Sequence, residues 1–132
     1  MLRALGVFLS FLVLTGCKSE SIPIKAHEAE TQPPLAYKES VLNHIKRTYF
    51  DPYSIRSALI SEPIAYYRVG FGHVWFVCYK LNAKNRYGAY TGLKQSTCSF
   101  DGNMLTNCRE DSSDFNCGQA KYQPFPEAEE LK

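Results

Sequence analysis

Apolar and polar residues recur along this chain in patterns that predict one helix followed by several strands. In residues 38–50 the apolar side chains return at the helical spacing and would share one face. These side chains are Val41, Leu42, Ile45 and Tyr49. Asp51-Pro52 follows, and the residue before a proline avoids the helical region. We therefore expect a helix that ends close to residue 50.

The next segments have the composition of strands. Residues 54–62 and 64–69 are rich in Ile, Ala, Tyr and Val, and Pro63 separates them into one broken strand or two short ones. Residues 73–81, HVWFVCYKL, give the strongest strand signal. Both alternating faces of that strand are apolar, so we expect it to be central and covered on both sides.

A hairpin completes the predicted sheet. Asp101-Gly102-Asn103 is a tight-turn signature inside residues 94–106. The order of elements predicts an α+β fold, with one N-terminal helix packed on a small, mostly antiparallel sheet of three to five strands.

The first residues have the pattern of an export signal. Arg3 precedes an apolar run from Ala4 to Leu14, which is too short to span a membrane but has the length of a signal-peptide core. The run ends in Leu14-Thr15-Gly16-Cys17, which resembles the lipobox of bacterial lipoproteins. The competing interpretation is an ordinary cleaved signal peptide with an incidental cysteine.

The lipobox resemblance implies a membrane anchor. In bacterial lipoproteins the chain is cut before the cysteine, and Cys17 would then carry a diacylglycerol and an amide-linked acyl chain such as palmitate. Several acyl chains on one residue give stable anchoring. The next residue is Lys18 rather than Asp. By resemblance to enterobacterial lipoproteins, this implies the outer membrane, facing the periplasm.

These features divide the chain into four parts. We expect a leader over 1–16, a lipidated cysteine with a polar, proline-bearing tether over 17–36, and an α+β domain over 37–122. The polar residues 123–132 read as a mobile tail.

Composition narrows the function classes. Removing residues 1–16 from the 132 leaves 116, enough for one small domain. With 45% apolar and 21% charged residues, the chain is not disordered, collagen-like or a coiled coil. A net charge of +2 does not favour nucleic-acid binding, and we expect none.

The five cysteines are Cys17, Cys78, Cys98, Cys108 and Cys117. Lipidation of Cys17 explains the odd number and leaves four for two disulfides in an oxidising compartment. Among three possible pairings we favour Cys78–Cys98 and Cys108–Cys117. Zinc is the alternative, but the spacing contains no C-x-x-C pair, and we expect no metal.

Residues 76–92, FVCYKLNAKNRYGAYTG, carry a second resemblance. Together with Asp51-Pro52 and Ser54, this segment resembles small exported bacterial proteins with an N-A-K-N-x-Y-G-x-Y-x-G motif. The sequence departs from that motif at Ala89, where a second glycine is expected. The resemblance implies a fold and an envelope location. It implies no activity and supplies no catalytic residues.

The same segment holds the best candidate binding surface. Its residues are Asn82, Lys84, Asn85, Arg86, Tyr87 and Tyr90. Aromatic rings and cations together suit sugars, lipid head groups, phosphates or carboxylates. The structural alternative is a shaped loop that turns the chain between two strands and leaves its charges in solvent.

No catalytic template fits the sequence. His27, His44 and His73 have no metal-ligand spacing, and no nucleophile motif of the G-x-S-x-G type occurs. We expect a non-catalytic, cofactor-free envelope lipoprotein whose domain binds an envelope protein, peptidoglycan or lipid head groups. The alternatives are an accessory subunit of an envelope assembly such as a secretion apparatus, or an inhibitor or exclusion factor for an envelope enzyme, toxin or phage.

Overall fold

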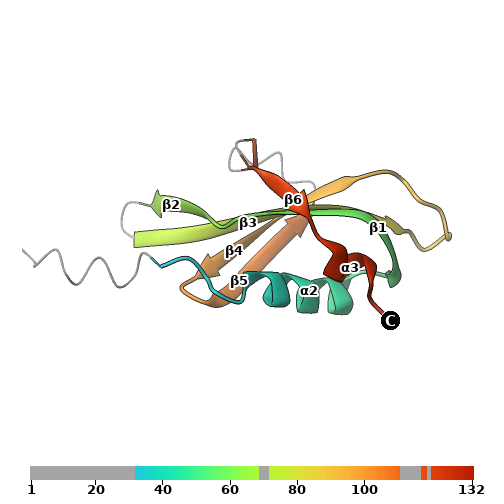
Figure 1. Cartoon of the computed structure of the whole chain (residues 1–132), viewed down its shortest axis with the longest axis horizontal. Coiled ribbons are helices and arrows are strands. Elements are labelled where there is room, and N and C mark those ends of the chain that lie inside the picture. Colours follow the sequence, from blue (N-terminus) through green and yellow to red (C-terminus); the bar gives the residue numbers. More distant parts are fainter. Residues whose placement is uncertain (1–31, 69–71, 111–116, 119) are drawn as a thin grey trace, which may run out of the picture.

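The computed structural model describes residues 32–68, 72–110, 117–118 and 120–132. The expected leader, Cys17 and most of the expected tether lie outside these described residues. Within them, one long helix lies along one face of a β-sheet (Figure 1).

The described elements are α2 (Tyr37–Thr48), β1 (Asp51–Ser61), β2 (Ile64–Arg68), β3 (Gly72–Lys84), β4 (Lys94–Asp101), β5 (Met104–Glu110), β6 (Tyr122–Pro124) and α3 (Pro126–Glu129). The strand order is β5-β4-β3-β1-β6, with β2 paired to β3, and every pairing is antiparallel. The α+β class and the antiparallel sheet agree with the sequence prediction. The described residues form six strands rather than three to five.

Helix α2 covers the segment whose apolar period predicts a helix. Val41 and Ile45 are fully buried against the sheet, and Leu42 and Tyr49 pack against the same core. Tyr49 is already extended, so the helix ends before the Asp51-Pro52 pair that begins β1. The apolar stripe therefore fixes which face of α2 meets the sheet.

Strand β3 is the centre of the sheet, as expected. It pairs with β4 along one edge and with both β1 and β2 along the other. The break at Pro63 therefore produces two separate strands, and both of them pair with β3. One face of β3 is buried in the core under α2 through Trp75, Val77 and Tyr79. On the opposite face Cys78 is buried but Phe76 is half-exposed, so only part of that face is covered.

Strand β1 is irregular where it runs beside β3. The pairing register shifts between Asp51 and Arg56 and again between Arg56 and Leu59. Ser57 lies in the second shift and has a φ of 56°, a left-handed conformation that is uncommon for a side chain other than Gly, Asn or Asp. These bulges let the first half of β1 leave the regular ladder and approach the loop after β3.

Two disulfides form, as the cysteine count predicts, but the favoured pairing is wrong. The bonds join Cys78 to Cys117 and Cys98 to Cys108. Cys98 lies opposite Val77 in the β3–β4 register, and Cys78 lies opposite Thr97. Cys78 and Cys98 therefore point to opposite faces of the sheet and cannot meet. Cys98 and Cys108 are directly paired across β4 and β5, with their Cα atoms 4.0 Å apart.

The expected mobile tail is also wrong for residues 123–132. Strand β6 pairs with β1, and α3 follows near the C-terminal end of α2 (Figure 1). Phe125 and Ala128 are buried in the core. Glu129 Oε1 accepts a hydrogen bond of 2.7 Å from the Ala58 amide, at a β1 bulge. The few apolar side chains within the polar C-terminal sequence therefore hold this segment against the core of the domain.

The expected tether also ends earlier than residue 36. Pro34 is buried, and the Leu35 amide donates to Asn103 Oδ1 in the β4–β5 turn at 2.9 Å. The folded domain therefore extends from about residue 34 to the last described residues.

Candidate functional site

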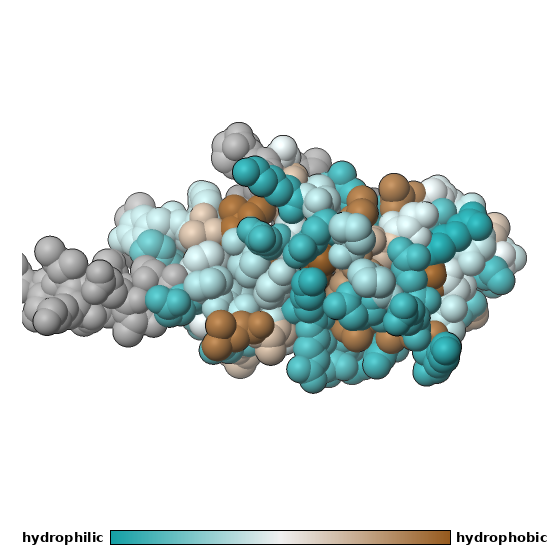
Figure 2. Space-filling model, viewed as in Figure 1, coloured by the Kyte–Doolittle hydropathy of each residue, from teal (hydrophilic) through white to brown (hydrophobic). Residues whose placement is uncertain are grey.

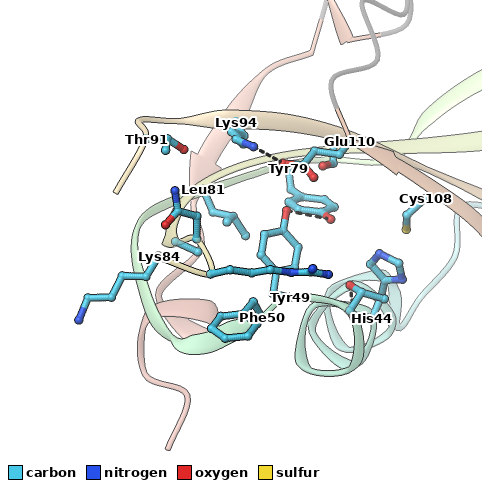
Figure 3. Close-up of a pocket in the computed structure, with 15 residues that line it drawn as sticks. His44, Tyr49, Phe50, Tyr79, Leu81, Lys84, Thr91, Lys94, Cys108 and Glu110 are labelled. Carbon is cyan, nitrogen blue, oxygen red and sulfur yellow. Dashed lines mark hydrogen bonds and ion pairs between the residues drawn. The ribbon is translucent and has the colours of Figure 1, made fainter. Parts of the chain in front are cut away.

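A cavity of about 410 Å³ lies between the C-terminal end of α2 and the sheet (Figure 3). Its walls come from the end of α2, from strands β3, β4 and β5, and from the loop after β3. The lining residues are His44, Thr48, Tyr49, Phe50, Tyr79, Leu81, Ala83, Lys84, Asn85, Arg86, Thr91, Lys94, Ser96, Cys108 and Glu110. This volume is within the range of small-molecule sites.

Three hydroxyl groups gather beneath the cavity. Tyr49 and Tyr79 point towards each other from the helix side and the sheet side, and the Tyr49 hydroxyl donates a long hydrogen bond of 3.5 Å to that of Tyr79 (Figure 3). Ser96 lies opposite Tyr79 in the β3–β4 register and is almost fully buried. The Ser96 oxygen has no hydrogen-bond partner of good geometry among the described residues.

Burial controls the ionisation of the two phenols. It raises the pKa of Tyr49 far above 10 and raises that of Tyr79 as well, while the neighbouring Ser96 hydroxyl partly opposes both shifts. Both phenols are therefore protonated near neutral pH. They can act as hydrogen-bond donors, and they cannot act as general bases.

Positive charge predominates around the cavity. Lys84, Arg86 and Lys94 line it, against a single carboxylate, Glu110. Lys94 Nζ and Glu110 Oε1 form a half-exposed ion pair of 3.0 Å. Lys84 extends its ammonium group away from the phenols (Figure 3). Arg86 is the third lining cation, and the Lys94–Glu110 ion pair does not include it.

His44 adds a neutral group on the helix side. Burial, and then the nearby Arg47, lower the pKa of His44 below its ordinary value of 6.5. The imidazole is therefore mostly uncharged near pH 7. The Ser96 oxygen makes no hydrogen bond to it, so the two do not form an activated nucleophile pair.

Half of the residues predicted to form a binding surface instead stabilise the loop after β3. Asn85 Oδ1 accepts hydrogen bonds from the amides of Tyr87 and Ala89, and Asn82 Oδ1 accepts one from Gly92. Gly88 has a φ of 74°, the left-handed conformation that this turn requires. These side chains replace missing backbone partners, as turn asparagines commonly do.

Tyr90 fastens the same loop to β1. Its hydroxyl donates to the Ser54 carbonyl at 2.8 Å, and the Arg56 guanidinium lies 3.6 Å from its ring centre. The Ser54 hydroxyl accepts from the Lys84 amide at 2.9 Å. The structural interpretation of Asn82, Asn85 and Tyr90 therefore has direct support from their contacts.

The predicted residues also differ in their position relative to the cavity. Lys84, Asn85 and Arg86 line the cavity, whereas Tyr87 is 94% exposed at the loop tip and does not. Sequence reasoning missed Tyr49, Tyr79 and Ser96. The available signal was Tyr79 itself, a hydroxyl-bearing side chain on the apolar face of the central strand.

The surface visible in Figure 2 is mainly hydrophilic, with small separate hydrophobic groups. Among the described residues, no helix has the length and apolar content needed to cross a membrane. The described part of the chain also contains no cluster of three or more His, Cys, Asp or Glu side chains placed to hold a metal ion.

We compared the chain with protein-family models, with curated proteins and with solved structures, and none of them matches it. The cavity offers protonated phenols, a buried serine hydroxyl and an excess of cationic groups at one end of the helix-covered sheet face.

Proposed function

We propose that this protein is a lipid-anchored component of the bacterial cell envelope whose small domain binds a ligand without catalysing a reaction. Residues 1–16 export the chain, Cys17 carries the acyl chains, and a polar tether holds the domain away from an outer-membrane surface. The domain is presented to the periplasm.

The cysteine arrangement carries this proposal. Four of the five cysteines bond to one another, which leaves Cys17 as the one cysteine with no cysteine partner in the chain. Disulfides of this kind persist in oxidising compartments, which supports export. The cysteine left over is the one that lies in the Leu14-Thr15-Gly16-Cys17 motif.

The cavity supports binding over catalysis. Its phenols are protonated near neutral pH, and the Ser96 hydroxyl has no base within hydrogen-bond reach among the described residues. The cavity presents hydrogen-bond donors and positive charge, which suit the binding of a ligand with acceptor oxygens or negative charge.

The test is the intact mass of the full chain purified from bacterial membranes, before and after reduction. We expect a chain that begins at Cys17, carries three acyl chains and gains about four hydrogens when two disulfides are reduced. Cys17→Ser is the matched control, and it should leave the membrane fraction with both disulfides intact. An unacylated mass for the natural sequence, or membrane retention of Cys17→Ser, would contradict the anchor.

A further inference from the structure

The cavity has a chemical requirement that its own residues do not satisfy. Ser96 is almost fully buried and its oxygen has no good partner among the described residues. Tyr79 beside it accepts a long bond of 3.5 Å from Tyr49. Buried polar groups without partners are costly, and each one calls for an explanation such as a bound molecule or a functional role. Protonated hydroxyls next to a cavity favour a ligand that carries acceptor oxygens.

The charges around the cavity define the second requirement. Three cationic side chains and one carboxylate line it, and the carboxylate of Glu110 is engaged by Lys94. A guanidinium such as that of Arg86 binds carboxylates and phosphates with two parallel hydrogen bonds. The excess positive charge therefore favours a ligand with one acidic group.

The apolar part of the lining defines the third requirement. Phe50, Leu81 and Ala83 contribute apolar surface beside the hydroxyl groups. A volume of about 410 Å³ is far larger than a single inorganic anion needs. A ligand with a ring that presents C–H groups on its faces and oxygens at its edges matches both surfaces.

From these three requirements we propose that the cavity binds an acidic sugar, a saccharide ring that carries a carboxylate or a phosphate, with the acidic group at Arg86 and ring oxygens directed to the hydroxyls of Tyr49 and Tyr79. The inference rests on the proposed binding function and names its class of ligand. Carboxylated sugars and phosphorylated sugars would each supply the acidic group that this site requires.

The test is isothermal titration calorimetry of the full, lipidated chain in neutral detergent micelles. The probes are glucuronate, glucose 6-phosphate and glucose, which share a ring and differ in the acidic group. We expect at least one of the two acids to bind at least tenfold more tightly than glucose, and the tighter acid identifies the source. Arg86→Gln should weaken that acid at least tenfold, and Arg86→Lys should weaken it less.

Lys121→Gln is the matched control, because it removes one positive charge at an exposed position that does not line the cavity. It should leave the affinity unchanged within a factor of two. Circular dichroism of each variant confirms that it is folded. Equal binding of glucose and both acids, no binding of any probe, or equal losses in Arg86→Gln and Lys121→Gln would each overturn the inference. Because every sample already carries the acyl chains, such a failure leaves the membrane anchor standing.

Discussion

The helix-covered face of the sheet has two halves that are equally buried and chemically different. In the core half, Trp75 lies opposite Phe100 and Val77 lies opposite Cys98. In the cavity half, Tyr79 lies opposite Ser96. Apart from the Trp75 indole nitrogen, the core half buries apolar groups, whereas the cavity half buries hydroxyls beside a cavity. The same two strands therefore contribute to the apolar core at one end and to the cavity at the other.

The largest effect is expected in the core half. Phe100 is fully buried in the cluster that includes Val41 and Ile45. Phe100→Ala should lower the free energy of unfolding by about 3–5 kcal/mol, because it removes a large apolar side chain and leaves a cavity. Chemical denaturation measures this change. A loss below about 1 kcal/mol would mean that the core half does not hold the fold together.

The two disulfides allow a comparison of the two sheet faces. Cys98–Cys108 spans 10 residues and lies on the helix-covered face, whereas Cys78–Cys117 spans 39 residues and lies on the other. The longer loop loses more entropy in the unfolded chain, so replacing its two cysteines by alanine should cost roughly 4 kcal/mol, against roughly 3 kcal/mol for the shorter loop. Denaturation of the two double variants gives the order, and the reverse order would contradict the entropic account.

High pH should destabilise the cavity half through its two buried phenols. Since the pKa values of Tyr49 and Tyr79 are raised in the folded state, the folded protein retains protons that the unfolded chain releases above pH 10. Stability is therefore intact below pH 10 and falls above it, by up to about 1.4 kcal/mol per pH unit for each phenol. Denaturation at pH 9 to 11 should show this slope, and Tyr79→Phe should reduce it. An unchanged slope in that variant would show that the Tyr79 phenol is not desolvated.

The smallest effect should have the opposite sign. Ser96→Ala removes a buried hydroxyl without a good partner, so the free energy of unfolding should rise by roughly 1 kcal/mol. Thr97→Val is a contrasting variant on the opposite face, because Thr97 Oγ1 contacts Cys117 Sγ at 2.9 Å. Removing that hydroxyl should lower the free energy of unfolding. If Ser96→Ala destabilises the protein as Thr97→Val does, Ser96 is a satisfied structural residue.

Local patterns predict much of this fold. The period of Val41, Ile45 and Tyr49 predicts α2, the two apolar faces of residues 73–81 predict the central strand, and Asp101-Gly102-Asn103 predicts the β4–β5 hairpin. Each of these signals lies within a short stretch of sequence, so it predicts a helix, strand or turn without knowledge of the rest of the chain.

Features that depend on the pairing register between strands cannot be predicted from such local patterns. Whether Cys98 meets Cys78 or Cys108 depends on a one-residue offset between strands, which reverses the direction of every side chain. The C-terminal attachment depends on Phe125 reaching a core built by distant residues. The cavity likewise joins Tyr49 to Tyr79, 30 positions later in the chain, through packing of α2 on the sheet.

We propose that ligand recognition is confined to the cavity half, and amide chemical-shift mapping during a glucuronate titration tests this proposal. We predict that shifts concentrate at Tyr49, Tyr79, Arg86 and Lys94, while Val77, Cys98 and Phe100 remain unchanged. Shifts spread evenly over both halves, or centred on the exposed Tyr87, would contradict the division of this face into a structural end and a binding end.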